Sequence, residues 1–380
     1  MILKQVATQI MRLFFALALG NIIGLATFAF FAIVSYALKV WELEITADFV
    51  SFSEVNYSMT LGAFMLGGSL IAGFIYSRLE GPRSHGPADL MVCIKKDELP
   101  DIKAGFITSF LTMVSVSSGS SVGMFGPIIH YGGCIAASLE RFFKVLTRGV
   151  VLAAGGAAGI AALFSAPIAA SIFAHEMLLR RFRSTESLPV IMAALGGYFS
   201  AVMLLGDNRR FLSVIGDPPP LEPFSLGMAI LVGIFSGLLS SLYVYLVGAG
   251  PGWVKKTNVP PFFRPLIAAT VLFAISPFFP QLIGPGMSAV NMALAGEFTL
   301  YLLIALAFLK VFATAFCRSF GFHGGILLPA CFFGAMLGSA FDLIVGNGGH
   351  LYAILGAAAC TGSAIGAPIA AVVILFEMSG

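Results

Sequence analysis

The residues with the clearest capacity for chemistry form a Gly/Ser/Pro cluster at positions 118–127, Ser-Gly-Ser-Ser-Val-Gly-Met-Phe-Gly-Pro. The cluster lies within residues 104–139, a run that contains no Asp, Glu, Lys or Arg. Its closing proline suits the first turn of a helix, and a helix beginning near Phe125 would point free backbone N–H groups and its positive dipole end at the break. Gly123 and Gly126 would let a ligand approach the backbone closely. The cluster therefore predicts an anion site without a charged side chain; the alternative is a Gly-rich crossing between packed helices.

Few ionisable side chains lie in the apolar parts of the chain, and each has two interpretations. Glu176 and Glu377 end apolar segments, where anchoring or an ion pair with Arg180 is favoured over proton transfer. His130 is expected to be buried and hydrogen-bonded, although it is also the best candidate for a proton relay. Lys310 is isolated in an apolar stretch, so we expect it to reach the membrane surface or to find a partner. Three further residues would either add polar groups to the pore or have a local structural role: Arg83, His85 and His323.

The composition is that of a membrane protein. Of 380 residues, 58% are hydrophobic and 10% are charged, and the mean hydropathy is +0.97, which is typical of a polytopic membrane protein. A net charge of +3 gives no indication of nucleic-acid binding. The five cysteines are scattered and fit small packing residues better than a metal or disulfide framework. Paired intramembrane carboxylates, metal-spaced ligands and a Ser/His set are not evident, so we expect neither an enzyme nor a cofactor.

Runs free of Asp, Glu, Lys and Arg mark the expected membrane spans. Several exceed the about 20 residues that a helix needs to cross the hydrocarbon core, or contain internal Gly and Pro. We therefore expect an all-α bundle of uneven, partly discontinuous helices. Basic residues on short connections predict a cytoplasmic N-terminus by the positive-inside rule. The runs, with one further span at 188–205, are 13–38, 55–77, 104–139, 149–174, 223–254, 265–296, 298–309, 319–341 and 343–376.

Two distant segments carry the same pattern. Ala-Pro-Ile-Ala-Ala occurs with its proline at Pro167 and again at Pro368, an offset of 201 residues (368 − 167). Glu-Met follows each segment at the same distance, at Glu176 and Glu377. The central cluster has a weaker counterpart at residues 325–329, Gly-Ile-Leu-Leu-Pro, offset by 202 (325 − 123). Paired halves with Gly/Pro-interrupted segments at matching positions indicate a transport site near the middle of the bilayer.

The repeat predicts two membrane domains, at residues 1–205 and 206–380. After Glu176 the first half continues through the span at 188–205, whereas the second half ends at Gly380, shortly after Glu377. We therefore expect the second repeat to lack its last helices.

These motifs resemble those of the CLC family of chloride channels and proton-coupled chloride antiporters. Residues 83–87, Arg-Ser-His-Gly-Pro, are similar to the family's Gly-Ser-Gly-x-Pro, although Arg83 and His85 replace its glycines. Residues 123–127 are similar to its Gly-Lys/Arg-Glu-Gly-Pro, and residues 325–329 to its Gly-x-Phe-x-Pro. Together with the two Ala-Pro elements, the motifs agree in order and spacing over roughly residues 55–380.

The resemblance implies a CLC-type fold of two inverted repeats, made of discontinuous, tilted helices, in a homodimer with one pore per subunit. It implies that the Ser84 hydroxyl and nearby backbone amides hold the anion without the tight grip of a fixed charge. The residues expected at this site are Ser84, Gly123, Met124, Phe125, Gly126, Gly325, Ile326 and Leu327. The family's pore tyrosine has no assignable counterpart in this chain. The predicted partners are a monovalent anion, a second copy of the chain and the lipid bilayer.

Two departures from the family pattern decide the predicted mechanism. The family's gating glutamate falls at Phe125, and the second proton-transfer glutamate of its antiporters falls at Met177, one residue after Glu176. Neither side chain can carry a proton, and proton relays through membranes need ionisable groups. We therefore predict passive conduction of a monovalent anion, chloride by default, with Phe125 as a steric or hydrophobic gate. The alternatives are transport of bicarbonate or nitrate, and proton-coupled antiport through His130 or Glu176; the fluoride-exporting branch resembles the chain poorly at the gate.

Overall fold

The computed structural model describes residues 2–47, 55–78, 86–142, 145–205, 212, 223–346 and 350–379. Every named element in this part of the chain is a helix, and its β-type pairing is an isolated antiparallel bridge between Gly123 and Gly325. Six of the described helices are long and apolar enough to cross a membrane. The prediction of an all-α, multi-pass membrane protein is therefore confirmed.

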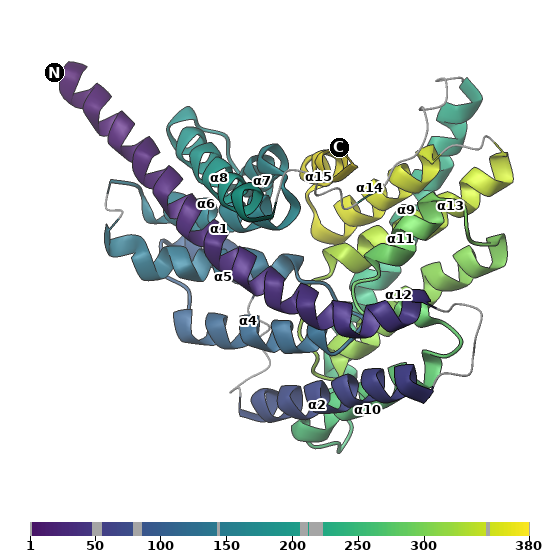
Figure 1. The fold of residues 1–380 in the computed structure, drawn as a ribbon. Coiled ribbons are helices and arrows are strands. Elements are labelled where there is room, and N and C mark those ends of the chain that lie inside the picture. The colour runs from purple at the N-terminus through teal and green to yellow at the C-terminus, as the bar shows by residue number, and fades with distance from the viewer. Residues whose placement is uncertain are drawn as a thin grey trace.

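Most of the helices described before residue 206 pack on one another, whereas α2 packs chiefly on α10 of the later part of the chain. A π-helical turn, η2 (Ala174–Leu179), follows α7, and the long α1 crosses this half and packs on α8 and α6 (Figure 1). The helices are α1 (Ile2–Ala47), α2 (Val55–Arg78), α3 (Pro87–Lys96), α4 (Ile102–Ser117), α5 (Phe125–Leu139), η1 (Glu140–Phe142), α6 (Arg148–Phe164), α7 (Pro167–Phe173) and α8 (Ser184–Leu205).

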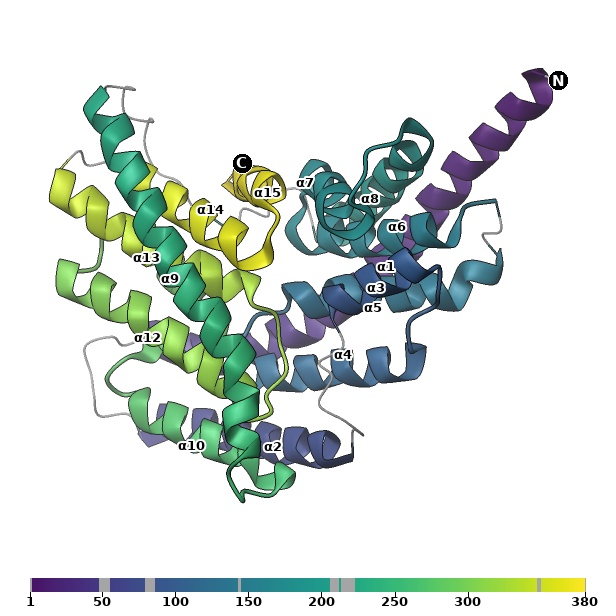
Figure 2. The same cartoon turned by 180° about the vertical axis from the view of Figure 1, so that it is seen from behind.

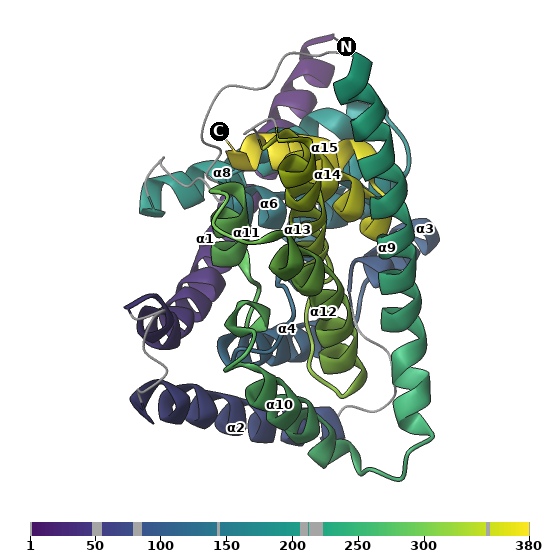
Figure 3. The ribbon, with the colours of Figure 1, turned by 90° about the vertical axis from the view of Figure 1, so that its right-hand side faces the viewer.

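The helices described after residue 222 form the second half. Here α9 runs along one side of the molecule, and α10 lies beside α2 at the end away from the C-terminus (Figures 2 and 3). The helices are α9 (Pro223–Lys255), η3 (Pro261–Phe263), α10 (Arg264–Ile275), η4 (Pro280–Leu282), α11 (Met287–Leu294), α12 (Leu300–Ser319), α13 (Leu327–Val345), α14 (Leu351–Ile365) and α15 (Pro368–Ser379).

The long apolar runs break where the sequence predicts, at small residues followed by proline. The run at 104–139 divides into α4 and α5. Before Pro167 and Pro368, which open α7 and α15, Ser165 and Gly366 adopt left-handed backbone with φ of 55° and 71°. These two positions are 201 residues apart (366 − 165). In each case a residue in the left-handed conformation ends one helix and a proline begins the next. The breaks before α7 and before α15 therefore have the same backbone conformation.

Equivalent helix pairs pack through glycine in each half. A methyl group on Gly132 of α5 would lie 2.3 Å from the carbonyl oxygen of Gly155 in α6. A methyl group on Gly334 of α13 would likewise lie 2.3 Å from the carbonyl oxygen of Gly356 in α14. Separations this short exclude any side chain, so both helix pairs require glycine to approach as they do. These contacts set the positions of α5 and α13, and therefore of their N-terminal ends.

One predicted boundary is wrong. Lys310 was expected to separate the run at 298–309 from the following segment, but it lies inside the single helix α12. Of the two expectations for Lys310, reaching the membrane surface or finding a partner, the second holds, because its side chain is fully buried. The ammonium donates to the carbonyl oxygens of Gly284 at 2.8 Å and Leu282 at 3.2 Å, and lies 4.8 Å above the ring of Phe332. Helix α12 tolerates the cation because protein groups replace its water.

Candidate functional site

Two loops pair through their backbones where α5 and α13 begin. The Gly123 N–H donates to the Gly325 carbonyl oxygen at 3.0 Å, and the Gly325 N–H donates to the Gly123 carbonyl oxygen at 2.5 Å. Met124 and Ile326 follow as the N-cap residues of α5 and α13, and neither provides a side-chain cap. The first-turn N–H groups of both helices therefore face this crossing without a side-chain acceptor from their cap residues.

The absence of a side chain at Gly325 keeps space open beside the first turn of α5. A methyl group at this position would lie 2.8 Å from the Gly126 nitrogen and 3.0 Å from the Phe125 nitrogen. On the other side, a methyl group on Gly126 would meet the ring of Pro87, the first residue of α3, at 3.5 Å. The N-termini of α3, α5 and α13 therefore converge, and their aligned dipoles favour negative charge between them.

The expected site residues gather at this crossing wherever the structure describes them. Met124, Phe125 and Leu327 are only 4%, 2% and 1% exposed, so their side chains are enclosed and their backbones carry the polar groups. The residue expected to contribute a hydroxyl, Ser84, lies outside the described residues, as do Arg83 and His85. The expected site residues that the structure describes therefore offer backbone N–H groups and no polar side chains of their own.

Phe125 lies within an aromatic cluster at the start of α5. Its ring centroid is 5.5 Å from that of Phe164, at the end of α6, and 5.5 Å from that of Phe173, at the end of α7. The second contact is edge-to-face, a favourable arrangement for aromatic rings. The position that the family resemblance assigns to an ionisable gate thus holds an apolar ring packed against two others.

Side-chain and backbone contacts hold the loop at 118–124 from several directions. The Gly284 N–H donates to the Gly119 carbonyl oxygen at 2.9 Å, and Lys310 binds the Gly284 carbonyl oxygen. The His323 N–H donates to the Ser115 hydroxyl at 3.1 Å. The first of these contacts connects the loop to the segment before α11, and the bond from His323 connects the end of α4 to the segment between α12 and α13.

Sequence reasoning missed two polar residues that border the crossing, Tyr243 and Arg318, whereas a third, Ser121, belongs to the predicted cluster. The Tyr243 hydroxyl, on α9, donates to the Ile326 carbonyl oxygen at 3.2 Å. The Arg318 guanidinium, in the last turn of α12, donates to the Gly324 carbonyl oxygen. The Ser121 hydroxyl is buried and has no hydrogen-bond partner among the described residues. Arg318 could have been suspected from its place at the edge of an apolar run, whereas Tyr243 carries no local sequence signal.

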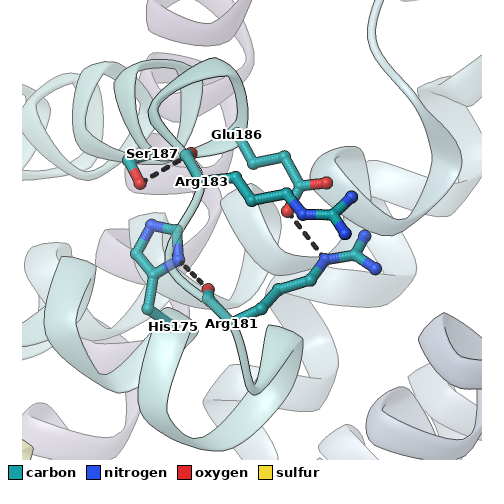
Figure 4. A network of polar contacts seen from close by, with 5 residues as sticks. All are labelled: His175, Arg181, Arg183, Glu186 and Ser187. Carbon is teal, nitrogen blue, oxygen red and sulfur yellow. Dashed lines mark hydrogen bonds and ion pairs between the residues drawn. The ribbon is translucent and has the colours of Figure 1, made fainter.

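The segment after α7 is held by a separate polar network (Figure 4). His175 Nδ1 lies 2.9 Å from the Arg181 carbonyl oxygen, and the Arg181 guanidinium binds the Glu186 carboxylate at 2.8 Å. The ion pair of this connection therefore involves Arg181, while the Glu176 carboxylate accepts hydrogen bonds from the first turn of α15. Met177 is half-buried against the core and offers no acid at the expected proton-transfer position.

His130 is buried, as expected. It is 1% exposed, and its Nδ1 lies 3.6 Å from the Cys134 sulfur one turn along α5. Because His130 lies near the start of α5, it remains the alternative candidate for a proton relay.

Comparisons with known proteins agree with this architecture. The model of the voltage gated chloride channel family matches residues 68–380. The chain is 28% identical over 283 residues to the H(+)/Cl(-) exchange transporter ClcA of Vibrio cholerae, covering 70% of this chain but only 60% of that protein. It is 26% identical over 325 residues to the voltage-gated ClC-type chloride channel ClcB of Escherichia coli, covering 82% of this chain and 77% of that protein.

A solved structure shares the fold. The crystal structure of a CLC-type fluoride/proton antiporter superposes with a TM-score of 0.79 and 20% identity, covering 100% of this chain and 95% of the other. With the family model spanning most of its length and this fold around the paired loops, the chain belongs to the voltage gated chloride channel family, the CLC family of membrane anion transporters.

Proposed function

We propose that this chain conducts a monovalent anion passively across the membrane, chloride by default, past the crossing of Gly123 and Gly325. The observation that carries the proposal is the convergence of three helix N-termini on this crossing, with no carboxylate at residues 123–126 or 325–327. The acid in the first turn of α3, Asp89, accepts a hydrogen bond from the Gly86 N–H of its own helix start. N–H groups and dipole ends replace the water around an anion yet grip it weakly enough for release. The anion would be bound by the backbones of residues 123–126 and 325–327, with the Ser84 hydroxyl.

Phe125 is the proposed gate. Its enclosed ring can open or close the path only by moving, since it has no proton to gain or lose. Met177 is equally unable to take a proton, which removes the second carboxylate that a coupled route would use. Transport would then run down the anion gradient without proton exchange.

The relatives include both a proton-coupled exchanger and a channel, so the transport mode of this chain needs a direct test. The Vibrio cholerae relative is named as a proton/chloride exchanger, whereas the Escherichia coli relative is named as a chloride channel. A coupled alternative would rely on His130, which is buried near the start of α5. Bicarbonate or nitrate is the alternative substrate.

The deciding experiment measures anion efflux from proteoliposomes with simultaneous recording of chloride and external pH. We expect chloride efflux without proton uptake, with the Vibrio cholerae exchanger as the positive control for proton movement. Proton uptake in fixed ratio to chloride efflux would overturn the passive mode. His130→Gln would then show whether that residue carries the proton.

We further propose that residues 1–205 and 206–380 form two membrane repeats and that the protein is a homodimer. The recurrence of paired features about 201 residues apart, such as Ser165 with Gly366, supports the repeat division. Cross-linking in native membranes, followed by mass measurement, tests the dimer.

A further inference from the structure

A cavity of about 440 Å³ lies between α9, α10 and α12 in the described structure, away from the crossing of the two loops. Figure 2 shows α9 crossing over α12 toward α10. The cavity follows α9 from Leu246 to Thr257 and α12 from Leu309 to Phe320. Each stretch advances by 11 residues (257 − 246 and 320 − 309), so the lined face of each helix is about 16 Å long. The cavity is therefore elongated.

The interior of this cavity suits a hydrocarbon chain. Most of the side chains that line it are aliphatic or aromatic, and its two hydroxyl groups belong to Thr257 and Ser319. The Ser319 hydroxyl donates to the Ala315 carbonyl oxygen at 2.6 Å. The Thr257 hydroxyl donates to the Val254 carbonyl oxygen, also at 2.6 Å. Because backbone oxygens already accept both hydroxyl protons, the cavity favours a ligand that needs no hydrogen bonds over a polar one.

The cavity can be reached from the bilayer. Two of the helices that form it, α9 and α12, are long and apolar enough to cross a membrane. Three of its lining residues, one from each helix, are Trp253, Val271 and Phe312, which are 48%, 40% and 50% exposed. Large apolar side chains exposed on membrane-spanning helices face lipid. A lipid chain could therefore enter the cavity without passing through water.

Positive charge gathers where the cavity reaches the end of α9. Lys255 is the last residue of α9 and Lys256 follows it, and both are exposed directly beside the lining residues Trp253 and Thr257. Residues 223–296 contain these two lysines and Arg264 but no Asp or Glu. Basic residues and an aromatic ring at the end of a membrane-spanning helix are typical of the headgroup region, where lysines attract anionic lipids.

We propose that the cavity holds an acyl chain of an anionic phospholipid, whose phosphate lies against Lys255 and Lys256. Burial of the chain supplies affinity, and the two lysines select the negative headgroup over a zwitterionic one. The bound molecule is a membrane lipid and not the conducted anion, so this site is independent of the proposed function.

Trp253 can report on the occupant, because it lines the cavity. The chain has two tryptophans, so Trp41→Phe gives a parent protein in which Trp253 alone emits. The purified full chain in detergent is titrated with phosphatidylglycerol brominated on its acyl chains, since bromine quenches tryptophan fluorescence only at short range. Phosphatidylcholine with the same brominated chains serves for comparison, because it carries no net charge.

Two variants of this parent test the chain and the headgroup separately. Ala313→Phe fills the cavity from α12, and the double change Lys255→Gln with Lys256→Gln removes the charges at its end.

Each variant has a matched control. Ala26 is, like Ala313, a half-buried alanine packed against the core, but it lies on α1 and does not line the cavity, so Ala26→Phe controls for the added ring. Lys95 and Lys96 are an exposed lysine pair in the last turn of α3, so their double change to Gln controls for lost charge.

We expect phosphatidylglycerol to quench Trp253 saturably, with a midpoint about tenfold or more below that of phosphatidylcholine. The Lys255/Lys256 variant should raise the phosphatidylglycerol midpoint to that of phosphatidylcholine. Ala313→Phe should abolish saturable quenching by both lipids, because the ring occupies the space of the chain. Both controls should bind as the parent does.

Two kinds of result would overturn this assignment. Quenching that does not saturate, or that persists unchanged in Ala313→Phe, would mean that no lipid chain enters the cavity. Equal midpoints for the two lipids in the parent, or an unchanged phosphatidylglycerol midpoint in the Lys255/Lys256 variant, would mean that the site does not select an anionic headgroup. If Ala313→Phe fails to fold, as judged by size-exclusion chromatography, Val271→Phe replaces it with the same expectation, because Val271 lines the cavity from an exposed position on α10.

Discussion

Glu176 and Glu377 cap each other's helical segments. Glu176 binds the first turn of α15, the helix that contains Glu377, and Glu377 binds the first turn of α7, the helix that precedes Glu176. The Glu176 carboxylate accepts hydrogen bonds from the Ile369 and Ala370 N–H groups of α15, at 3.2 and 2.8 Å. The Glu377 carboxylate accepts from the Ile168 and Ala169 N–H groups of α7, at 3.2 and 2.7 Å. Two helix N-termini that lack neighbouring caps are thus capped from the opposite half of the molecule, so the two halves are joined by a reciprocal contact.

The reciprocal caps predict matched losses of stability. Glu176→Gln and Glu377→Gln should each lower the free energy of unfolding by about 1 kcal/mol, because each removes a charge from a helix N-terminus. Thermal unfolding in detergent measures the change. Glu186→Gln is the control, since its ion pair with the half-exposed Arg181 should contribute less than about 1 kcal/mol. A loss confined to one of the two caps would contradict their equivalence.

The sequence repeat predicted the equivalence of these glutamates but not their partners. The constant offset placed Glu176 and Glu377 at matching positions, and anchoring was the favoured interpretation. Arg180 was considered as the ion-pair partner because it is nearby in sequence. The real partners are backbone N–H donors at helix ends 194 and 208 residues away, and spacing along a chain does not reveal which helix end a side chain will reach.

Gly325→Ala should block the proposed site. The added methyl group would lie 2.8 Å from the Gly126 nitrogen and 3.0 Å from the Phe125 nitrogen, where an anion would accept its hydrogen bonds. Anion flux in proteoliposomes should fall by about tenfold or more, since one hydrogen bond to a charged group is worth about 1.5–3 kcal/mol. Gly126→Ala is the control within the same site, because its nearest contact would be an ordinary 3.5 Å. Equal flux in the two variants would argue against an anion at this position.

Phe125→Ala should separate packing from gating. Loss of a ring that is 2% exposed should cost about 3–5 kcal/mol of stability through the cavity it leaves. If the ring is the gate, anion efflux per folded protein should nevertheless increase. Phe30→Ala removes a ring that is 3% exposed in α1, so it should lower stability without raising efflux. A fall in efflux with Phe125→Ala, at preserved folding, would assign the ring to packing alone.

Lys310→Met should destabilise the loop network without touching the anion site directly. The change leaves the Leu282 and Gly284 carbonyl oxygens without their donor, at an expected cost of about 1–3 kcal/mol. Chemical unfolding monitored by tryptophan fluorescence provides the measurement. Lys255→Met, at an exposed position, should change stability by less than about 0.5 kcal/mol. If the two variants were equally stable, the buried ammonium would have no structural role.

Helix α12 shows where charge-based reading of the sequence fails. Counting charge-free runs located most spans, because a charge facing lipid is costly. It failed at Lys310 and gave no role to Arg318, since both are accommodated by carbonyl oxygens from other segments. Tyr243 was missed for the same reason: its hydroxyl meets Ile326, 83 residues away. The backbone breaks were predictable from the Gly, Ser and Pro pattern, whereas the glycine contacts between helices and the polar contacts depend on tertiary structure.

The double hydrogen bond between Gly123 and Gly325 has a kinetic consequence. Separating α5 from α13 would break both bonds at once and disturb the loop contacts around them, so large helix movements at the crossing carry a steep barrier. Rotation of a single aromatic side chain breaks no backbone bond and is intrinsically faster than collective helix motion. If Phe125 is the gate of a passive pathway, anion flux should therefore depend less steeply on temperature than transport by a protein that must rearrange its backbone in every cycle.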